Sequence, residues 1–221
     1  MQVKNYATPE EIIVEYNEYD IPHVGKQIND VINEIEDVLK IIVLNRSLKC
    51  ITFSEALGPK TVNKKLASIL GDIQEQLANS GVYGASKAVL LHLIQLECIK
   101  NYTREEETTH VLGYFITEFT KFRKLLEDEM QDVRDMEKIH KYSCDQVQKL
   151  FTVLKNFRIN KCTDQKFSCI IFVQQQCTAN VLYHILKNLS AHDEEFKFLQ
   201  SDFLAGLSNN PYKNSRESLC I

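Results

Sequence analysis

A change in hydrophobic periodicity near Asn160 constrains this chain more than any other feature of its sequence. Before that point, apolar residues recur at intervals of three and four, which is the spacing of amphipathic helices. After it, residues 170–173 form a continuous β-branched and aromatic run, Ile-Ile-Phe-Val. Such a run is typical of a strand buried on both faces of a parallel sheet. The sequence therefore predicts a helical body that leads into a sheet-containing segment.

The segment after this expected strand returns to helical spacing. A single apolar stripe lies along it, made of Ala179, Leu182, Ile185, Leu186 and Leu189. A second short apolar run, Phe196–Leu199, follows a polar turn. Strand, helix and strand in this order predict a βαβ unit, the opening of a doubly wound α/β domain. The polar sequence after Phe203 predicts a loop. Because such a domain needs roughly four or five strands and only two are expected here, we expect the chain to be a fragment that holds only its beginning.

Five helices are expected before the change in periodicity, over residues 23–45, 61–78, 85–100, 104–138 and 143–157. Gly81 is expected to close the second of these helices, because glycine adopts the left-handed conformation of a helix end without steric cost. Thr103 with Glu106 and Ser143 with Gln146 match the capping-box pattern at helix starts. The fourth helix would be about 50 Å long at a rise of about 1.5 Å per residue.

The fold class predicted is therefore mostly α: a helical bundle followed by the first βαβ unit of an incomplete α/β domain. Residues 1–20 are expected to form a strand and linker, residues 21–160 the bundle, and residues 161–221 the start of the α/β domain. The polar stretch 160–166 marks the boundary between the last two.

Composition favours a cytosolic or nuclear protein, and we expect a cytoplasmic one. The formal net charge is −4, so the basic bias of many nucleic-acid-binding proteins is absent. No apolar run reaches the roughly 18 residues that span a bilayer, and the N-terminus lacks the apolar centre of a signal peptide. The seven cysteines have no zinc-finger spacing, so we interpret them as reduced packing residues.

A self-contained active site is not expected. The sequence has no phosphate-binding loop, no His-Glu-x-x-His motif and no Gly-x-Ser-x-Gly motif. His92 and His184 fall within helical patterns and are interpreted as core or surface histidines. The acidic runs 105–107 and 193–195 are interpreted as a helix N-terminus and a solvated turn. We therefore expect this chain alone neither to hydrolyse ATP nor to cleave RNA.

Four segments in order resemble the Dicer ribonucleases. Residues 169–182 resemble the start of the second RecA-like helicase domain of that family, and residues 198–206 resemble its second strand and glycine. Residues 6–14 look like the strand that leaves the first helicase domain. Residues 80–87 are similar to a glycine-aromatic turn inside the family's helical insertion. The run Asn-Pro-Tyr-Lys-Asn-Ser-Arg-Glu near the C-terminus looks most like insect Dicers of the siRNA-producing type.

This resemblance implies a function. The helices would be the insertion between two helicase lobes of an ATP-dependent endoribonuclease that processes double-stranded RNA into small RNAs for RNA silencing. The matching positions for contact with the RNA backbone are Gln175, Gln176, Thr178, Ser201 and Gly206. The family often has Arg at the positions of Gln175 or Gln176, and glutamine supplies no charge for counterion release. Thr178 could instead cap the helix that follows.

The resemblance also implies cofactors and partners. ATP and Mg²⁺ would belong to the full-length protein, and no cofactor is expected in this fragment. Double-stranded RNA is the expected ligand, and a double-stranded-RNA-binding protein would dock on the helical insertion. No membrane contact is expected. Two alternatives remain: a RIG-I-type sensor of double-stranded RNA, which shares the insertion but signals rather than cleaves, and a non-enzymatic helical adaptor.

Overall fold

The computed structural model describes residues 13–15, 17, 25–44, 62–104, 106–160 and 168–204. All regular secondary structure in these ranges is helical, so the mostly α prediction is confirmed. The elements are α1 (Gly25–Leu44), α2 (Val62–Tyr102), α3 (Glu106–Glu129), α4 (Asp135–Tyr142), α5 (Asp145–Asn160), α6 (Gln176–His192) and a 3₁₀ turn, η2 (Glu194–Phe196).

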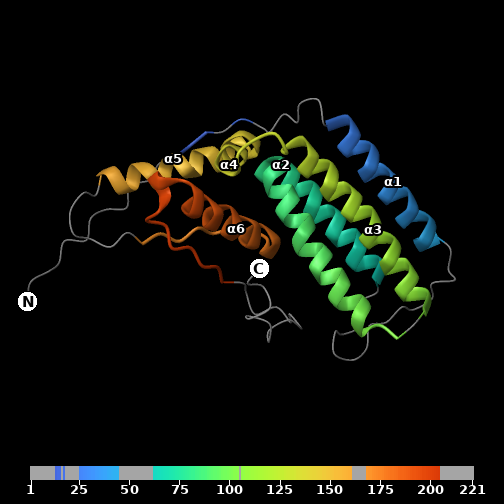
Figure 1. Ribbon diagram of the computed structural model, residues 1–221. Coiled ribbons are helices and arrows are strands. Elements are labelled where there is room, and N and C mark those ends of the chain that lie inside the picture. The colour runs from blue at the N-terminus through green and yellow to red at the C-terminus, as the bar shows by residue number, and fades with distance from the viewer. Residues whose placement is uncertain are drawn as a thin grey trace, which may run out of the picture.

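The chain reverses direction within α2. Gly81 has φ 77° and ψ −174°, which interrupts the helix and leaves two arms, 62–80 and 82–102, that fold back on each other (Figure 1). This backbone conformation is accessible essentially to glycine alone. The expected break at Gly81 is thus confirmed, and a single residue is enough to make it.

The corner of α2 lies against the connection between α4 and α5. A Cβ atom on Gly81 would stand 2.5 Å from the carbonyl oxygen of Tyr142 and 2.8 Å from the backbone nitrogen of Cys144. The Cys144 N–H donates to the Ser80 carbonyl at 3.4 Å, and its thiol donates to the Asn79 carbonyl at 2.8 Å. Two helix corners therefore touch, which only a residue without a side chain at position 81 permits.

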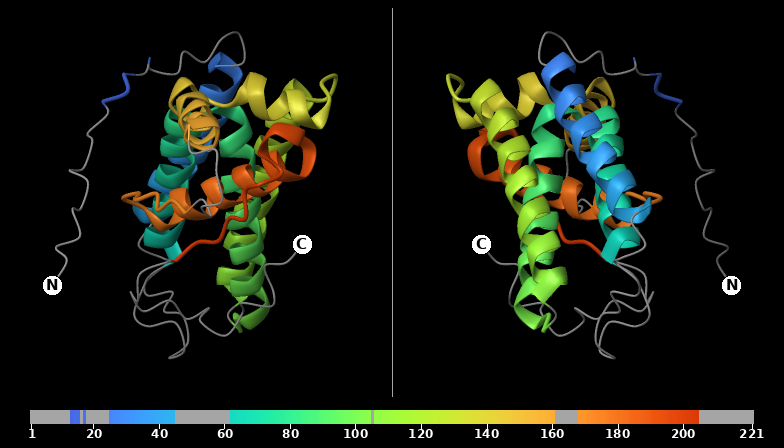
Figure 2. Two further views of the ribbon diagram at one scale, coloured as in Figure 1. Left: turned by 90° about the vertical axis from the view of Figure 1, so that its left-hand side faces the viewer. Right: turned by 90° about the vertical axis from the view of Figure 1, so that its right-hand side faces the viewer.

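The apolar faces of α1, α3 and both arms of α2 form the larger part of the core. In Figure 2 these helices run roughly alongside one another, and α6 crosses α2. Each burial of a large aliphatic or aromatic side chain contributes about 1.5–3 kcal/mol. The residues predicted to face inward are confirmed as buried at Ile28, Ile32, Ile35, Leu39, Leu66, Ile69, Leu70, Ile73, Leu77, Val89, Leu93, Leu96, Ile99, Leu112, Phe115, Phe119, Phe122, Leu126, Val147, Phe151 and Leu154.

The long helix expected over 104–138 is two helices. α3 ends at Glu129, a turn occupies residues 130–134, and α4 begins at Asp135. Three consecutive acidic residues, 127–129, fall at the end of α3, where the helix dipole disfavours negative charge. The Tyr142 hydroxyl donates to the Glu129 carbonyl at 2.8 Å and so satisfies one terminal group. Met136, predicted to face inward, is 38% exposed because of the turn.

The start of α5 also differs from the prediction. The oxygen of Ser143 is buried and has no hydrogen-bond partner among the described residues, so the expected Ser143–Gln146 capping box is not formed. Cys144 directly precedes the helix instead, and its sulfur faces the backbone N–H groups of Gln146 and Val147. At the other end of α5, Phe157 is 42% exposed rather than inward.

The C-terminal segment shows its expected helix without a sheet. α6 buries Val181, Ile185, Leu186 and Leu189 against α2 and α4. Residues 168–173 carry no regular secondary structure, and Ile170 is 76% and Phe172 90% exposed. Phe196 lies in η2, and its ring packs on Phe151 at 5.9 Å between centroids, so residues 196–199 do not form the second strand. The described residues thus hold no βαβ unit.

One stretch, Lys65–Tyr102, is long and apolar enough to cross a membrane by composition. It lies within α2, reverses at Gly81 and has 61% of its most apolar window buried inside the protein. These properties are those of a core helix.

Candidate functional site

Polar side chains gather where the first turn of α6 meets the two arms of α2. Gln175, Cys177 and Thr178 face Asp72, Glu75 and Gln76 on the first arm and His92 on the second. Most of the surrounding interface is apolar, and Val181 of α6 lies against the Gly84 backbone. The site therefore draws on three helical segments that the sequence keeps far apart.

Asp72, His92 and Cys177 form a compact cluster in this interface. The Asp72 Oδ2 atom lies 3.2 Å from His92 Nε2, and Cys177 Sγ lies 3.6 Å from the same nitrogen. The three potential ligand atoms all lie within 4.8 Å of one another. The other ring nitrogen, His92 Nδ1, is 3.3 Å from Gln95 Oε1. His92 is 4% exposed, so the imidazole is surrounded by protein.

The cluster is not built for nucleophilic catalysis. In a cysteine–histidine–carboxylate triad, the nucleophile and the carboxylate contact opposite nitrogens of the ring. Here both Asp72 and Cys177 face Nε2. Burial, followed by the negative charges of Asp72 and Glu75, raises the pKa of the Cys177 thiol to about 12. A thiol with this pKa is not an activated nucleophile.

Gln76 connects the corner of α2 to α6. Its side chain is fully buried, and its Nε2 donates to Thr178 Oγ1 at 2.7 Å. Its Oε1 accepts from Ser80 Oγ at 2.8 Å. Since Ser80 directly precedes Gly81, the position of α6 is tied to the turn that folds α2 back. Thr178 is used in this bridge and does not cap α6, which begins after Gln175.

The structure places the other residues expected to contact RNA as follows. Gln175 Nε2 donates to Glu75 Oε2, and Gln175 Oε1 is a buried oxygen with no partner among the described residues. Gln176 is exposed at the first position of α6. Ser201 is half-buried, and Gly206 lies outside the described residues. Gln175, Gln176 and Thr178 are thus brought to one end of α6, and their contact with RNA stays a prediction.

Reasoning from the sequence missed the cluster of Asp72, His92 and Cys177. The three residues lack any metal-site spacing, and a histidine within a helical pattern, such as His92, is typical of a core or surface position. One signal was available. Asp72 precedes Gly81 by nine positions and His92 follows it by eleven, so a reversal at Gly81 sets them opposite each other. Nothing in the sequence indicated that Cys177 would join them.

A second polar surface lies further along α6. Asn188 Nδ2 donates to the Tyr83 hydroxyl at 2.9 Å, and the Lys87 ammonium stands 4.9 Å from the centre of the Tyr83 ring. Burial and the charges of Lys87 and Lys187 lower the pKa of His184.

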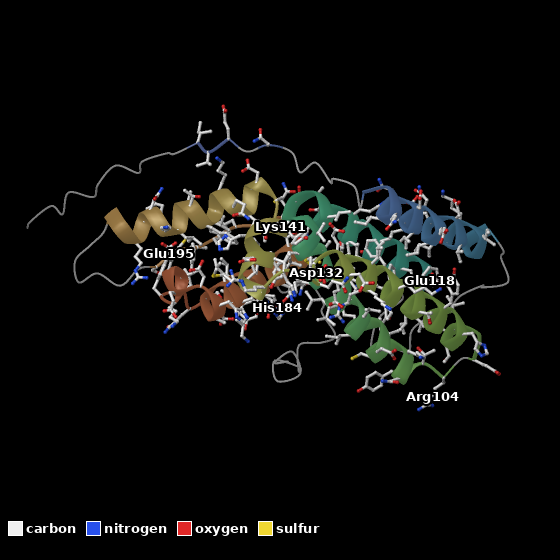
Figure 3. The ribbon with its side chains drawn as sticks, turned by 45° about the horizontal axis from the view of Figure 1, so that its top comes forward. Arg104, Glu118, Asp132, Lys141, His184 and Glu195 are labelled. Atoms are coloured by element: carbon white, nitrogen blue, oxygen red, sulfur yellow. The ribbon has the colours of Figure 1, made fainter. Side chains whose placement is uncertain are left out.

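Figure 3 labels His184 on α6, away from Arg104 at the end of α2 and from Glu195 beside α5. Glu195 accepts from Lys155 at 2.7 Å.

Comparison with known proteins gives one informative similarity. No family model matches the chain. The chain is 27% identical to the protein named endoribonuclease dcr-1 of Caenorhabditis elegans in an alignment of 124 residues that covers 53% of this chain. The matched part is 6% of that protein, so the chain corresponds to a small share of this relative. The similarity supports a Dicer-like relationship.

Proposed function

We propose that this chain is part of a Dicer-type, ATP-dependent endoribonuclease that processes double-stranded RNA into small RNAs. The observation that carries the proposal is its similarity to endoribonuclease dcr-1 over 124 residues. The helical bundle is compatible with it. In this proposal, residues 21–160 are the insertion between two helicase lobes, and residues 161–221 begin the second lobe.

The segment 168–173 supports the second part of the proposal. Ile170, Ile171 and Phe172 are exposed and have no neighbouring strand among the described residues. Exposed β-branched and aromatic residues in a row are a liability in a soluble protein, and pairing within a sheet removes it. In a complete RecA-like domain, strands from elsewhere in a longer protein would cover this segment.

Contact with RNA would occur through the backbone of the duplex. Hydroxyl and amide groups can hydrogen-bond phosphate oxygens without reading bases, which suits a protein that binds duplex RNA of any sequence. The proposed contacts are Gln175, Gln176, Thr178, Ser201 and Gly206. Gln175 and Thr178 already hydrogen-bond to α2, so the exposed Gln176 is the most accessible of the residues at the start of α6.

The remaining parts of the proposal concern the whole protein. ATP and Mg²⁺ would serve helicase and ribonuclease centres outside this chain. A double-stranded-RNA-binding protein would dock on the helical insertion, and the complex would work in the cytoplasm.

A charge substitution tests the RNA contact. In the full-length protein, Gln176→Arg adds a cation at the start of α6 and should tighten duplex-RNA binding. The slope of log K against log salt should steepen by about 0.7–0.9, the value for one added phosphate contact. Gln27→Arg adds the same charge at an exposed position of α1, which packs on α2 and α3, and should leave the slope unchanged. Equal slopes for both variants would exclude Gln176 from the interface.

Sequencing of the transcript beyond both ends tests the family assignment. A phosphate-binding loop and an Asp-Glu motif upstream, with ribonuclease carboxylates downstream, are the expected result. A cysteine-rich C-terminal domain would instead support a RIG-I-type sensor. A transcript with none of these motifs would leave a non-enzymatic helical adaptor and overturn the proposal.

A further inference from the structure

We propose that Asp72, His92 and Cys177 bind a divalent transition-metal ion, best matched by Zn²⁺, which links α6 to both arms of α2. The site would be independent of the proposed RNA function. It would use one carboxylate from the first arm, one imidazole from the second and one thiolate from the start of α6.

The spacing of the ligand atoms agrees with zinc coordination. Zinc binds sulfur at about 2.3 Å and nitrogen or carboxylate oxygen at about 2.0–2.2 Å, in tetrahedral geometry. These lengths put sulfur about 3.6 Å from nitrogen, and nitrogen about 3.3 Å from oxygen. The observed separations from His92 Nε2 are 3.6 Å to Cys177 Sγ and 3.2 Å to Asp72 Oδ2. The carboxylate and the sulfur, within 4.8 Å, would need to approach by at most about 1.2 Å.

When the His92 ring is neutral, hydrogen bonding satisfies the cluster less well than a metal cation does. A neutral imidazole carries either one hydrogen or one lone pair on Nε2. If Nε2 carries the hydrogen, Asp72 and Cys177 compete for that one donor. If Nε2 carries the lone pair, the Asp72 oxygen faces another hydrogen-bond acceptor. A cation among the three groups can accept a lone pair from each at once. This difference matters because His92 is buried and Asp72 and Cys177 are half-buried. Buried polar groups are costly to leave unpaired.

The orientation of the His92 ring also fits. A metal-binding histidine usually donates its second N–H to an oxygen, which fixes the tautomer and leaves the other nitrogen free for the metal. Gln95 Oε1 lies 3.3 Å from Nδ1 and can accept that hydrogen. Nε2 would then direct its lone pair towards Asp72 and Cys177.

The ligand set selects the type of metal. Thiolate and imidazole favour zinc and its neighbours, whereas Mg²⁺ and Ca²⁺ prefer oxygen ligands. Binding would displace the thiol proton of Cys177, which is released to the buffer. Thiolate and carboxylate together then neutralise the two charges of the ion. Three protein ligands leave a fourth position for water or for another side chain.

Cobalt substitution and calorimetry test the site directly. The untagged chain, treated with chelator and then titrated with Co²⁺, should bind one equivalent and show both tetrahedral d–d absorption and a thiolate-to-cobalt charge-transfer band. Zn²⁺ should abolish both signals. Titration with Zn²⁺ in buffers of different ionisation enthalpy should report the release of about one proton per ion. This second measurement needs no variant and so does not depend on a substituted protein folding.

Substitutions locate the ion. Cys177→Ser should abolish the charge-transfer band, and His92→Gln should weaken binding by more than the roughly 10–100-fold typical of second-shell changes. Cys169→Ser is the matched control, because Cys169 is exposed and eight positions away. It should bind as the unchanged chain does, and circular dichroism checks that each variant folds. Absence of stoichiometric binding, or a charge-transfer band that survives Cys177→Ser, would overturn the proposal.

Discussion

Asp72 Oδ2 and His92 Nε2 lie 3.2 Å apart although both residues belong to one helical element, α2. This contact exists because the chain reverses at Gly81. The same reversal places His92 of the second arm beside Cys177 of α6, next to the hydrogen bond between Gln76 of the first arm and Thr178. The conformation of one glycine therefore determines whether the polar interface can form, and the consequences can be measured.

Gly81→Ala should destabilise the chain by at least about 2 kcal/mol. A positive φ with extended ψ costs a residue with a Cβ about 1–3 kcal/mol, and that Cβ would also stand 2.5 Å from the Tyr142 carbonyl oxygen. Gly71→Ala is the control on the same arm, where an added Cβ meets nothing within 4 Å. It should stabilise the helix by about 0.5–1 kcal/mol. Urea unfolding followed by circular dichroism gives both values, and equal effects would contradict the role assigned to the corner.

Gln76 should matter more than its exposed neighbour Gln74. Gln76→Ala leaves Thr178 and Ser80 without their buried partner, so a loss of about 1–3 kcal/mol is expected. Gln74 donates to Glu36 at an exposed position, and Gln74→Ala should change stability by less than about 0.5 kcal/mol.

A double-mutant cycle isolates the contact between the helices. Gln76→Ala and Thr178→Ala should couple by about 0.5–1.5 kcal/mol, the usual net value of one hydrogen bond. Additive effects in urea unfolding would mean that the 2.7 Å contact does not tie α6 to α2.

The positions of the helices could be predicted because their signal is local. Apolar residues repeated every three or four positions define a face within a single helix, and Gly81 marks a break without any knowledge of its neighbours. The turn at 130–134 was missed because it has no glycine or proline and the apolar spacing continues through it. Similarly, Cys144 precedes α5 where the pattern of residue types favoured Ser143 as the cap.

The candidate site could not be predicted because it depends on contacts between elements. Asp72 and His92 meet only after the corner has formed, and Cys177 joins them only after α6 has packed. The expected sheet is a different case. A strand at 168–173 needs neighbouring strands for its hydrogen bonds, and none lies among the described residues, so the pairing stays a prediction.

The described cysteines should differ widely in reactivity. With a pKa of about 12, Cys177 has a thiolate fraction on the order of 10⁻⁴ at pH 8, whereas an ordinary thiol with a pKa of about 8.5 is about one quarter ionised. Burial also raises the pKa of Cys144. Iodoacetamide should therefore modify the exposed Cys169 first and Cys177 about a thousand times more slowly than an ordinary thiol.

Mass spectrometry of the labelled chain checks this order. The experiment is done with a chelator present, so that protection by a metal ion does not contribute. In denaturant, all four thiols at positions 98, 144, 169 and 177 should react at similar rates. Fast labelling of Cys177 in the folded chain would show that α6 does not hold it against α2.

Acidification should weaken the fold in part through His184. Burial, together with the charges of Lys87 and Lys187, lowers the pKa of this histidine in the folded chain below its ordinary value of 6.5. The unfolded chain then binds more protons than the folded chain once the pH falls below about 6.5. The contribution of the neutral imidazole is therefore complete above that pH and is lost as the pH falls towards the lowered pKa.

His184→Gln should remove this part of the pH dependence. Between pH 7.5 and 5, the free energy of unfolding should fall less steeply for the variant than for the unchanged chain. Lys187→Gln removes one of the two cations that lower the pKa and leaves the burial, so its slope should lie between the other two. Urea unfolding at several pH values measures all three slopes. A variant that loses stability on acidification as steeply as the unchanged chain would show that His184 takes up its proton equally well in the folded and unfolded states.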